Sequence, residues 1–182
     1  MILLTTSRRP TDLIRSLVRD FSNSVFDAVR VNRGKMSLDG VAERAIELEV
    51  DQVVLVDRWH RGLGKISFFT VGSGGLVPFP PSMLVSDVRL RRDFEKRQRI
   101  RSSVITMTVE DSSELERLAG CLSKFFSLPI LSLAKAAKSH RASLHLSFSS
   151  SRQIQITFMI LRRMVEIGPR VTLSKLVWEI QS

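Results

Sequence analysis

The order of apolar and polar residues predicts alternating strands and helices in the first half of the chain. Short apolar runs suit buried strands, whereas apolar residues spaced three and four apart, as over residues 13–21, suit helices. The predicted elements are strands at residues 2–6, 26–31, 52–59 and 66–71, a helix that Pro10 begins, a helix that Ser37 caps, and a turn at 60–65.

The second half repeats this order after a stretch rich in glycine and proline. Residues 72–82 predict a linker, and residues 83–90 predict a connecting strand. The later elements are strands at 104–109, 129–131, 144–148, 153–160 and 171–180, a helix capped by Ser112, and a short helix at 132–139. We therefore expect a mixed α/β fold, with residues 1–182 as one domain and two similar tandem α/β halves at 1–80 and 83–182.

The charge of the chain indicates the class of molecule that it binds. The chain has 28 Lys and Arg against 18 Asp and Glu, a net charge of +10. Residues 1–85 hold 11 basic and 9 acidic residues, and residues 86–182 hold 17 and 9, so most of the excess lies in the second half. Such a charge attracts polyanions, and nucleic acid is the expected partner. A merely soluble basic protein is the alternative.

The sequence lacks the signatures of most other classes of protein. No apolar run is long enough for a membrane span, and the start lacks the pattern of a secretory signal, so we expect a cytoplasmic protein. A single cysteine, Cys121, permits no internal disulfide, and we interpret it as a core residue. Phosphate loops, dinucleotide fingerprints and paired-histidine metal motifs are absent. We predict a binding protein without catalysis, metal, cofactor or small-molecule substrate.

Basic residues follow each of the first three predicted strands. If these strands are parallel, their following loops meet at one edge of the sheet, and two of the loops also precede helix N-termini that favour anions. We predict that these side chains contact phosphate: Arg8, Arg9, Arg33, Lys35, His60 and Arg61. The alternative is that Arg8 and Arg33 form internal ion pairs. Their candidate partners are Asp12 and Asp39.

The strongest charge run covers residues 89–101, where seven of thirteen residues are basic and two are acidic. We call this segment the arm, and we predict that it binds a nucleic-acid backbone. A solvated connector between the halves is the alternative. The predicted contact residues are Arg89, Arg91, Arg92, Lys96, Arg97, Arg99 and Arg101. Two smaller clusters are interpreted as solvated surface, namely Lys135, Lys138, His140 and Arg141, and Arg162, Arg163 and Arg170. Trp59 and Phe94 are the best candidates for base stacking.

Four segments in order resemble the Brix domain family. They are ILLTTSRRPT at residues 2–11, VNRGKMSL at 31–38, VLVDRWHRG at 54–62 and IGPRVTL at 167–173. The resemblance is greatest to the small archaeal members and to the branch that includes the Brix subunit of the small-subunit processome. It implies two halves that are each similar to the anticodon-binding domain of class IIa aminoacyl-tRNA synthetases. The second half lacks copies of the Ser-Arg-Arg-Pro and Arg-Gly-Lys motifs, so the halves need not bind RNA alike.

The resemblance also implies a function. Such proteins are ribosome-biogenesis factors that bind precursor ribosomal RNA and assist its processing, its folding and small-subunit assembly, beside other assembly proteins. Eukaryotic members act in the nucleolus, and an archaeal one would act in the cytoplasm. Three other functions stay open: a protein-interaction scaffold within a ribonucleoprotein, a transfer-RNA-binding module and, least favoured, an enzyme acting on RNA.

Overall fold

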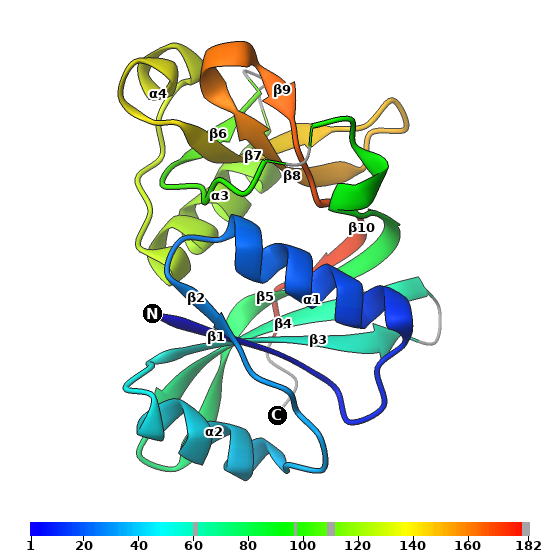
Figure 1. Cartoon of the computed structure of the whole chain (residues 1–182), viewed down its shortest axis with the longest axis vertical. Coiled ribbons are helices and arrows are strands. Elements are labelled where there is room, and N and C mark those ends of the chain that lie inside the picture. The colour runs from blue at the N-terminus through cyan, green and yellow to red at the C-terminus, as the bar shows by residue number, and fades with distance from the viewer. Residues whose placement is uncertain (60–61, 97, 109–111, 180–182) are drawn as a thin grey trace.

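The computed structural model describes residues 1–59, 62–96, 98–108 and 112–179 (Figure 1). Within these ranges, ten strands form one sheet in the order β2-β1-β3-β4-β5-β10-β8-β7-β6, and β9 pairs with β8. The strands are β1 (Ile2–Thr6), β2 (Ala28–Arg30), β3 (Gln52–Trp59), β4 (Gly62–Gly72), β5 (Gly75–Arg89), β6 (Ile105–Met107), β7 (Ala142–Phe148), β8 (Ile154–Ile160), β9 (Val165–Glu166) and β10 (Arg170–Val177). The helices are α1 (Asp12–Ser24), α2 (Leu38–Glu47), α3 (Ser113–Phe126) and α4 (Leu133–Ser139), with 3-10 helices η1 (Arg91–Asp93) and η2 (Leu161–Arg163).

Parallel pairing is confined to the two ends of the sheet. At one end β1 pairs in parallel with both β2 and β3, and at the other end β6 pairs in parallel with β7. The strands between these ends pair antiparallel, and the β5–β10 pair joins the part of the sheet built from β1–β5 to the part built from β6–β10. The predicted mixed α/β class is confirmed. The relation between two tandem halves stays a prediction.

Alternate side chains of the strands enter different cores, as expected for a sheet with helices on both faces. In β1, Ile2 and Leu4 belong to the largest core cluster, whereas Leu3 belongs to a second cluster. The largest cluster also contains the apolar faces of α1 and α3, and α2 covers the second. α4 packs through Ala136 on a third, smaller cluster. Figure 1 accordingly shows α1 in the middle of the molecule, with α2 at one end and α4 at the other.

Hydroxyl side chains cap the N-termini of the three long helices. The hydroxyl oxygens of Ser37 and Ser112 accept hydrogen bonds from backbone N–H groups three residues later, as predicted. α1 begins two residues later than Pro10, because Thr11 is its cap and accepts from the N–H of Ile14 at 3.3 Å. Among the described residues, no helix is long and apolar enough to cross a membrane.

The predicted linker at residues 72–82 is wrong. Gly72 and Gly75 close a tight hairpin, and β5 then runs without interruption through the three prolines. β10 pairs with β5 only from Ser82 onward, so residues 75–81 pair with β4 alone on one side. Proline lacks an N–H group and is tolerated at such an edge. The predicted boundary between residues 80 and 83 therefore lies inside a strand.

Other boundaries differ less. The expected strand at 26–31 shortens to the three residues of β2, and the expected strand at 129–131 reduces to a single bridge between Ile130 and Ile105. β4 begins at Gly62, so part of the expected turn at 60–65 is strand. The short elements η1, η2 and β9 had no clear signal in the sequence, because each spans two or three residues.

Candidate nucleic-acid interface

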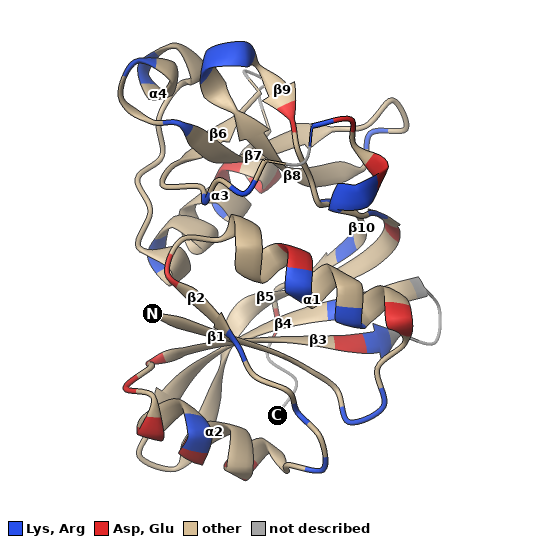
Figure 2. Cartoon of the chain, viewed as in Figure 1, with Lys and Arg blue, Asp and Glu red and all other residues tan. Residues whose placement is uncertain are grey.

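The loops after β1 and β2 meet at one edge of the sheet, as their parallel pairing requires. Figure 2 shows Lys and Arg on both of these loops. Together the loops enclose a pocket of about 340 Å³, which we call the first pocket. It is lined by Thr6, Ser7, Arg8, Pro10, Arg15, Val18, Arg30, Val31, Asn32, Arg33 and Gly34. His60 and Arg61, predicted to join this edge from β3, lie outside the described residues.

Two guanidinium groups converge at the wall of this pocket. The Nε atoms of Arg33 and Arg8 both donate to the backbone carbonyl of Met36, at 2.8 Å and 3.2 Å. Arg33 also donates from Nη1 to the carbonyl of Thr6 at 3.4 Å, and only 7% of its surface is exposed. Arg33 thus fixes the turn before α2 against the end of β1, and Arg8 lies beside it on the outside.

The electrostatics of this pair favour an anion. Burial lowers the pKa of Arg33, the charge of Arg8 lowers it further, and Asp57 acts in the opposite direction. A guanidinium stays protonated at neutral pH despite such a shift, so two positive charges remain close together. The Ser7 hydroxyl, which also lines the pocket, is buried and has no hydrogen-bond partner among the described residues. An oxyanion would supply the missing partner and the missing charge.

Among the described residues, Arg8 and Arg33 do not form the internal ion pairs that the alternative requires. Within the described ranges, Arg8 and Arg33 contact backbone carbonyls, and neither reaches a carboxylate. Asp12 instead pairs with Arg15 at 2.8 Å, one turn along α1. Arg15 and Arg30 line the pocket although sequence reasoning did not select them. Arg15 sits within a helical pattern, and Arg30 lies at the end of a predicted strand, where neither looked like a loop residue.

The two helix N-termini contribute less than expected. Thr11 and Ser37 each accept from one of the backbone N–H groups there. Each first turn also carries a carboxylate, on Asp12 and Asp39, which offsets the positive end of the helix dipole. An anion at this edge would therefore depend mainly on the arginine and lysine side chains. Lys35 and Arg9 are exposed and free to take part.

The arm divides into a structural part and an exposed part. Arg91 is buried; its backbone N–H donates to the carboxylate of Asp20 at 2.9 Å, and its guanidinium donates to the carbonyl of Gln98. Burial lowers the pKa of Arg91, and Asp20 opposes this shift. These contacts favour a role for Arg91 in holding the arm in place. The exposed members are Arg92, Lys96, Arg99 and Arg101, and Arg97 lies outside the described residues.

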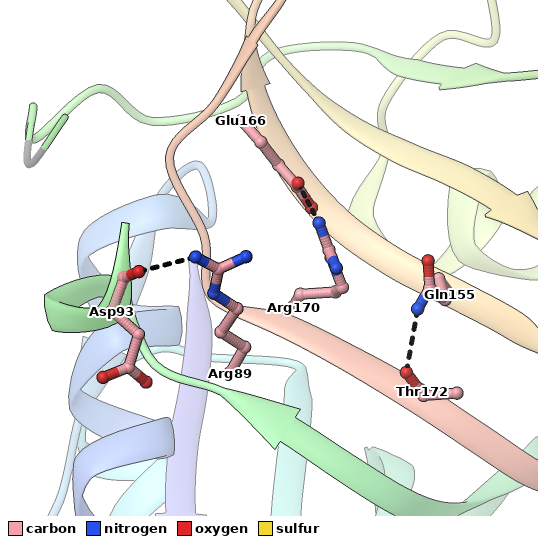
Figure 3. A network of polar contacts seen from close by, with 6 residues as sticks. All are labelled: Arg89, Asp93, Gln155, Glu166, Arg170 and Thr172. Atoms are coloured by element: carbon pink, nitrogen blue, oxygen red, sulfur yellow. Dashed lines mark hydrogen bonds and ion pairs between the residues drawn. The ribbon is translucent and has the colours of Figure 1, made fainter. Parts of the chain in front are cut away.

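Arg89 is the second arm residue with internal contacts (Figure 3). Its guanidinium lies over the ring of Phe94, 4.4 Å from the ring centre, and Nη2 donates to the carbonyl of Asp93 at 2.8 Å. Phe94 is buried, so the prediction that it stacks on bases is wrong. The side chain of Trp59, the other stacking candidate, lies outside the described part of the structure.

The Gly-Pro-Arg segment near the end of the chain packs against the same ring. Gly168 adopts a φ of +64°, and a Cβ atom there would lie 2.4 Å from a carbon of the Phe94 ring, so only glycine fits. Arg170 makes a bidentate ion pair with Glu166, in which Nε of Arg170 lies 2.7 Å from Oε1 of Glu166 (Figure 3). The hydrogen bond that Arg170 donates to Glu166 raises the pKa of Arg170. This motif has a structural role at the junction of β9 and β10.

Among the described residues, no cluster of three His, Cys, Asp or Glu side chains could hold a metal ion. His145 is buried in β7, and its Nδ1 lies 2.9 Å from the hydroxyl of Thr106. Burial lowers the pKa of His145, and Glu166 opposes the shift. This histidine belongs to a packed strand.

Comparison with known sequences gives one relative. No family model matches the chain. A stretch of 90 residues, 50% of the chain, is 34% identical to a probable Brix domain-containing ribosomal biogenesis protein from Aeropyrum pernix. The matched stretch also covers 50% of that relative, so the chain spans about half the length of the curated relative it matches.

Comparison with solved structures extends the likeness to nearly the whole chain. The crystal structure of a probable ribosomal biogenesis protein from Aeropyrum pernix K1 matches with a TM-score of 0.77 and 24% identity, over 97% of this chain and 98% of that one. Mil, an archaeal Imp4-like protein, matches with a TM-score of 0.66 and 20% identity, over 97% and 99%. The likeness at these identities is one of fold. Together with the curated relative, it confirms the resemblance to the Brix domain family that the four segments predict.

Proposed function

We propose that the chain is a ribosome-biogenesis factor of the Brix domain kind that binds precursor ribosomal RNA without catalysis. The observation that carries the proposal is the convergence of Arg8 and Arg33 in the first pocket, with no carboxylate partner among the described residues. The curated relative and one structural neighbour are both described as probable ribosomal biogenesis proteins, which supports the same role.

The RNA backbone is the natural ligand for such a surface. Guanidinium groups bind phosphate through two parallel hydrogen bonds, and each phosphate that is neutralised releases counterions. Arg8, Arg9 and Lys35 would supply these contacts at the first pocket, and the exposed arm residues Arg99 and Arg101 would extend them. Because the described residues offer no stacking pair of exposed aromatics, we expect selection by RNA shape. Other ribosome-assembly proteins are further proposed partners, and the archaeal cytoplasm is the proposed location.

The proposal is tested by RNA binding over a range of salt concentrations. The purified chain is titrated with a labelled archaeal small-subunit rRNA fragment that contains a helical junction, and with bulk tRNA. Tighter binding to the rRNA fragment with a steep salt slope is expected. Equal affinity for both RNAs would leave a nonspecific basic protein, and preference for tRNA would favour the transfer-RNA module.

A pair of variants localises the contact. Arg8→Gln/Lys35→Gln removes two exposed charges at the first pocket and should lower the slope of log K against log salt by about 2, or about 1 per contact. The matched control is Lys124→Gln/Lys175→Gln, which removes two exposed charges from α3 and β10. An equal effect of both double variants would mean that only the overall charge matters. Magnesium-dependent cleavage of the RNA would overturn the assignment as a factor without catalysis.

A further inference from the structure

We infer that the chain has a second phosphate-binding pocket, at the far end of the sheet from the first, and that one RNA occupies both. The second pocket has a volume of about 350 Å³, close to that of the first. It is lined by Gln98, Ile100, Arg141, Ile160, Arg162 and Arg163. These residues come from the arm and from two clusters that the sequence presents as unrelated surface. The identity of the ligand rests on the proposed function.

The backbone around this pocket is held in place by the core. Leu161, at the start of η2, is 1% exposed, and its N–H donates to the carbonyl of Arg141 at 3.0 Å. This bond ties the beginning of β7 to η2. Met164 then adopts a left-handed conformation and donates back to Leu161, which ends the turn. Arg162 and Arg163 therefore project from a turn whose neighbours are fixed on both sides.

The arm is positioned against the same pocket. The buried guanidinium of Arg91 donates to the carbonyl of Gln98, and the hydroxyl of Ser103 lies 2.8 Å from Nδ1 of His140, next to Arg141. Ile100 and Ile160 give the pocket an apolar lining between these polar groups. Such a lining lowers the local dielectric constant and strengthens any charged contact made there.

The charges of this pocket have no internal partner. Arg141, Arg162 and Arg163 are exposed, and within the described ranges none of their guanidinium groups makes an ion pair or hydrogen bond. No acidic residue lines the pocket. Three like charges around one hollow repel each other until an anion enters, and planar guanidinium groups match the oxygens of a phosphodiester.

Two arginines on the exposed face of α1 lead from the first pocket towards the arm, and this arrangement favours a long polyanion over a short acidic peptide. Arg15, which pairs with Asp12, lines the first pocket, and Arg19 follows one turn later. At the end of the helix the carbonyl of Ser24 accepts from the N–H of Ser102 at 2.8 Å, and the preceding arm residue, Arg101, is exposed. Ser24 lies nine positions after Arg15, or about 14 Å further along the helix.

The test uses the complete chain, the junction-containing small-subunit rRNA fragment and the variant Arg162→Gln/Arg163→Gln. Because both side chains are exposed, the thermal unfolding midpoint should match that of the wild type. We expect affinity for the fragment to fall at least tenfold, and the salt slope to fall by about 2. The control variant Lys124→Gln/Lys175→Gln should change the affinity and the salt slope much less. Combining Arg162→Gln/Arg163→Gln with Arg8→Gln/Lys35→Gln should remove both contributions.

The outcomes separate the two proposals. If the wild type fails to bind the rRNA fragment, the proposed function fails, and the second pocket fails with it. If the wild type binds and Arg8→Gln/Lys35→Gln weakens binding, while Arg162→Gln/Arg163→Gln behaves like the lysine control, the second pocket is overturned and the proposed function stands. Binding of a polyglutamate peptide that Arg162→Gln/Arg163→Gln abolishes, with RNA binding unchanged, would also overturn it in favour of a protein partner.

Discussion

The part of the molecule built from β1–β5 and the part built from β6–β10 each contain parallel strand pairing, two helices and antiparallel strands, but they place the arginines that line their pockets differently. In the first part, Arg8 and Arg33 lie at the carboxyl edge of the parallel strands. In the second part, β6 is followed in the sequence by Glu110 and Asp111, and the free guanidinium groups lie instead at the start of β7 and after β8. A similar order of elements therefore does not fix where a ligand binds, because the side chains at each edge decide it.

The two parts also differ in the groups that their partly or fully buried arginines bind. Arg33 donates to two backbone carbonyls and keeps its full charge beside a pocket. Arg170 forms an ion pair with Glu166 and lies near the ring of Phe94, so its charge is neutralised within the fold. We therefore expect substitutions in the first part to couple stability to RNA binding, and substitutions at the β9–β10 junction to change stability alone.

The largest effect should come from Gly168→Ala. The added Cβ would collide with the buried Phe94 ring, and alanine is strained at a φ of +64°. We expect the free energy of unfolding to fall by about 3 kcal/mol or more, measured by chemical denaturation. Gly120→Ala, on α3 with open space around its position, is the control and should raise stability by up to about 1 kcal/mol. An unchanged Gly168→Ala protein would show that the junction is not tightly packed.

Arg33→Met should have the next largest effect on stability. It removes the Arg33 donor from the carbonyl of Thr6 and leaves the carbonyl of Met36 with the longer bond from Arg8 alone, at a cost of about 1–3 kcal/mol in the free energy of unfolding. Arg8→Gln, at the exposed member of the pair, should stay within about 0.5 kcal/mol of the wild type. Both variants should bind RNA more weakly. Equal stability of the two variants would contradict the structural role of Arg33.

The ion pair between Glu166 and Arg170 predicts a pH dependence. Burial alone would raise the pKa of Glu166, but the hydrogen bonds from Arg170, with the nearby positive charges of Arg170 and Arg89, lower it overall. A carboxyl with a lowered folded pKa stabilises the protein above its unfolded pKa, and this contribution is lost as pH falls through the folded value. Glu166→Gln should therefore be less stable than the wild type by about 1–2 kcal/mol at neutral pH.

The measurement is the difference in unfolding free energy between wild type and Glu166→Gln across the acid range. The difference should shrink as pH falls from neutral to about pH 3. His145, whose pKa burial lowers, is present in both proteins, so most of its contribution cancels. A difference that stays constant over this range would mean that Glu166 has an ordinary pKa.

The smallest effect is expected where the two parts of the molecule touch. The hydroxyl of Ser102, directly after the arm, donates to the carbonyl of Ser24 at the end of α1, at 3.0 Å. Ser102→Ala removes this bond but keeps the backbone bond between the same residues, so stability should fall by only about 0.5–1 kcal/mol. Thermal unfolding measures this change, and a second transition in the variant would show that the two parts unfold separately.

Local signals in the sequence were sufficient for much of the fold. β3 matches its predicted bounds, and the caps at Ser37 and Ser112 lie where the hydroxyl residues indicated. The error at residues 72–82 has a definite cause, because glycine and proline mark turns in general but also occur at an unpaired strand edge. That edge exists only because β10 stops short along β5, and such long-range pairing leaves no trace in local composition.

The candidate site was predicted less completely than the fold. The parallel strands brought Arg8 and Arg33 to one edge as expected, but their shared contact depends on where a turn points the carbonyl of Met36. Likewise, Arg91 looked like its neighbours in the arm, and only tertiary packing buries it. Arg141 and Arg162 line the same pocket because β7 pairs antiparallel with β8, which places the end of β8 beside the start of β7.

The position of β10 has a consequence for synthesis. β10 lies between β5 and β8 in the sheet, yet it follows all other described strands in the chain. During translation, β1–β5 and β6–β9 leave the ribosome before the strand that unites them, and domains generally fold in that order. The nascent chain therefore carries two separate partial sheets until β10 is inserted. RNA contacts that span both partial sheets would become available only after translation has passed β10.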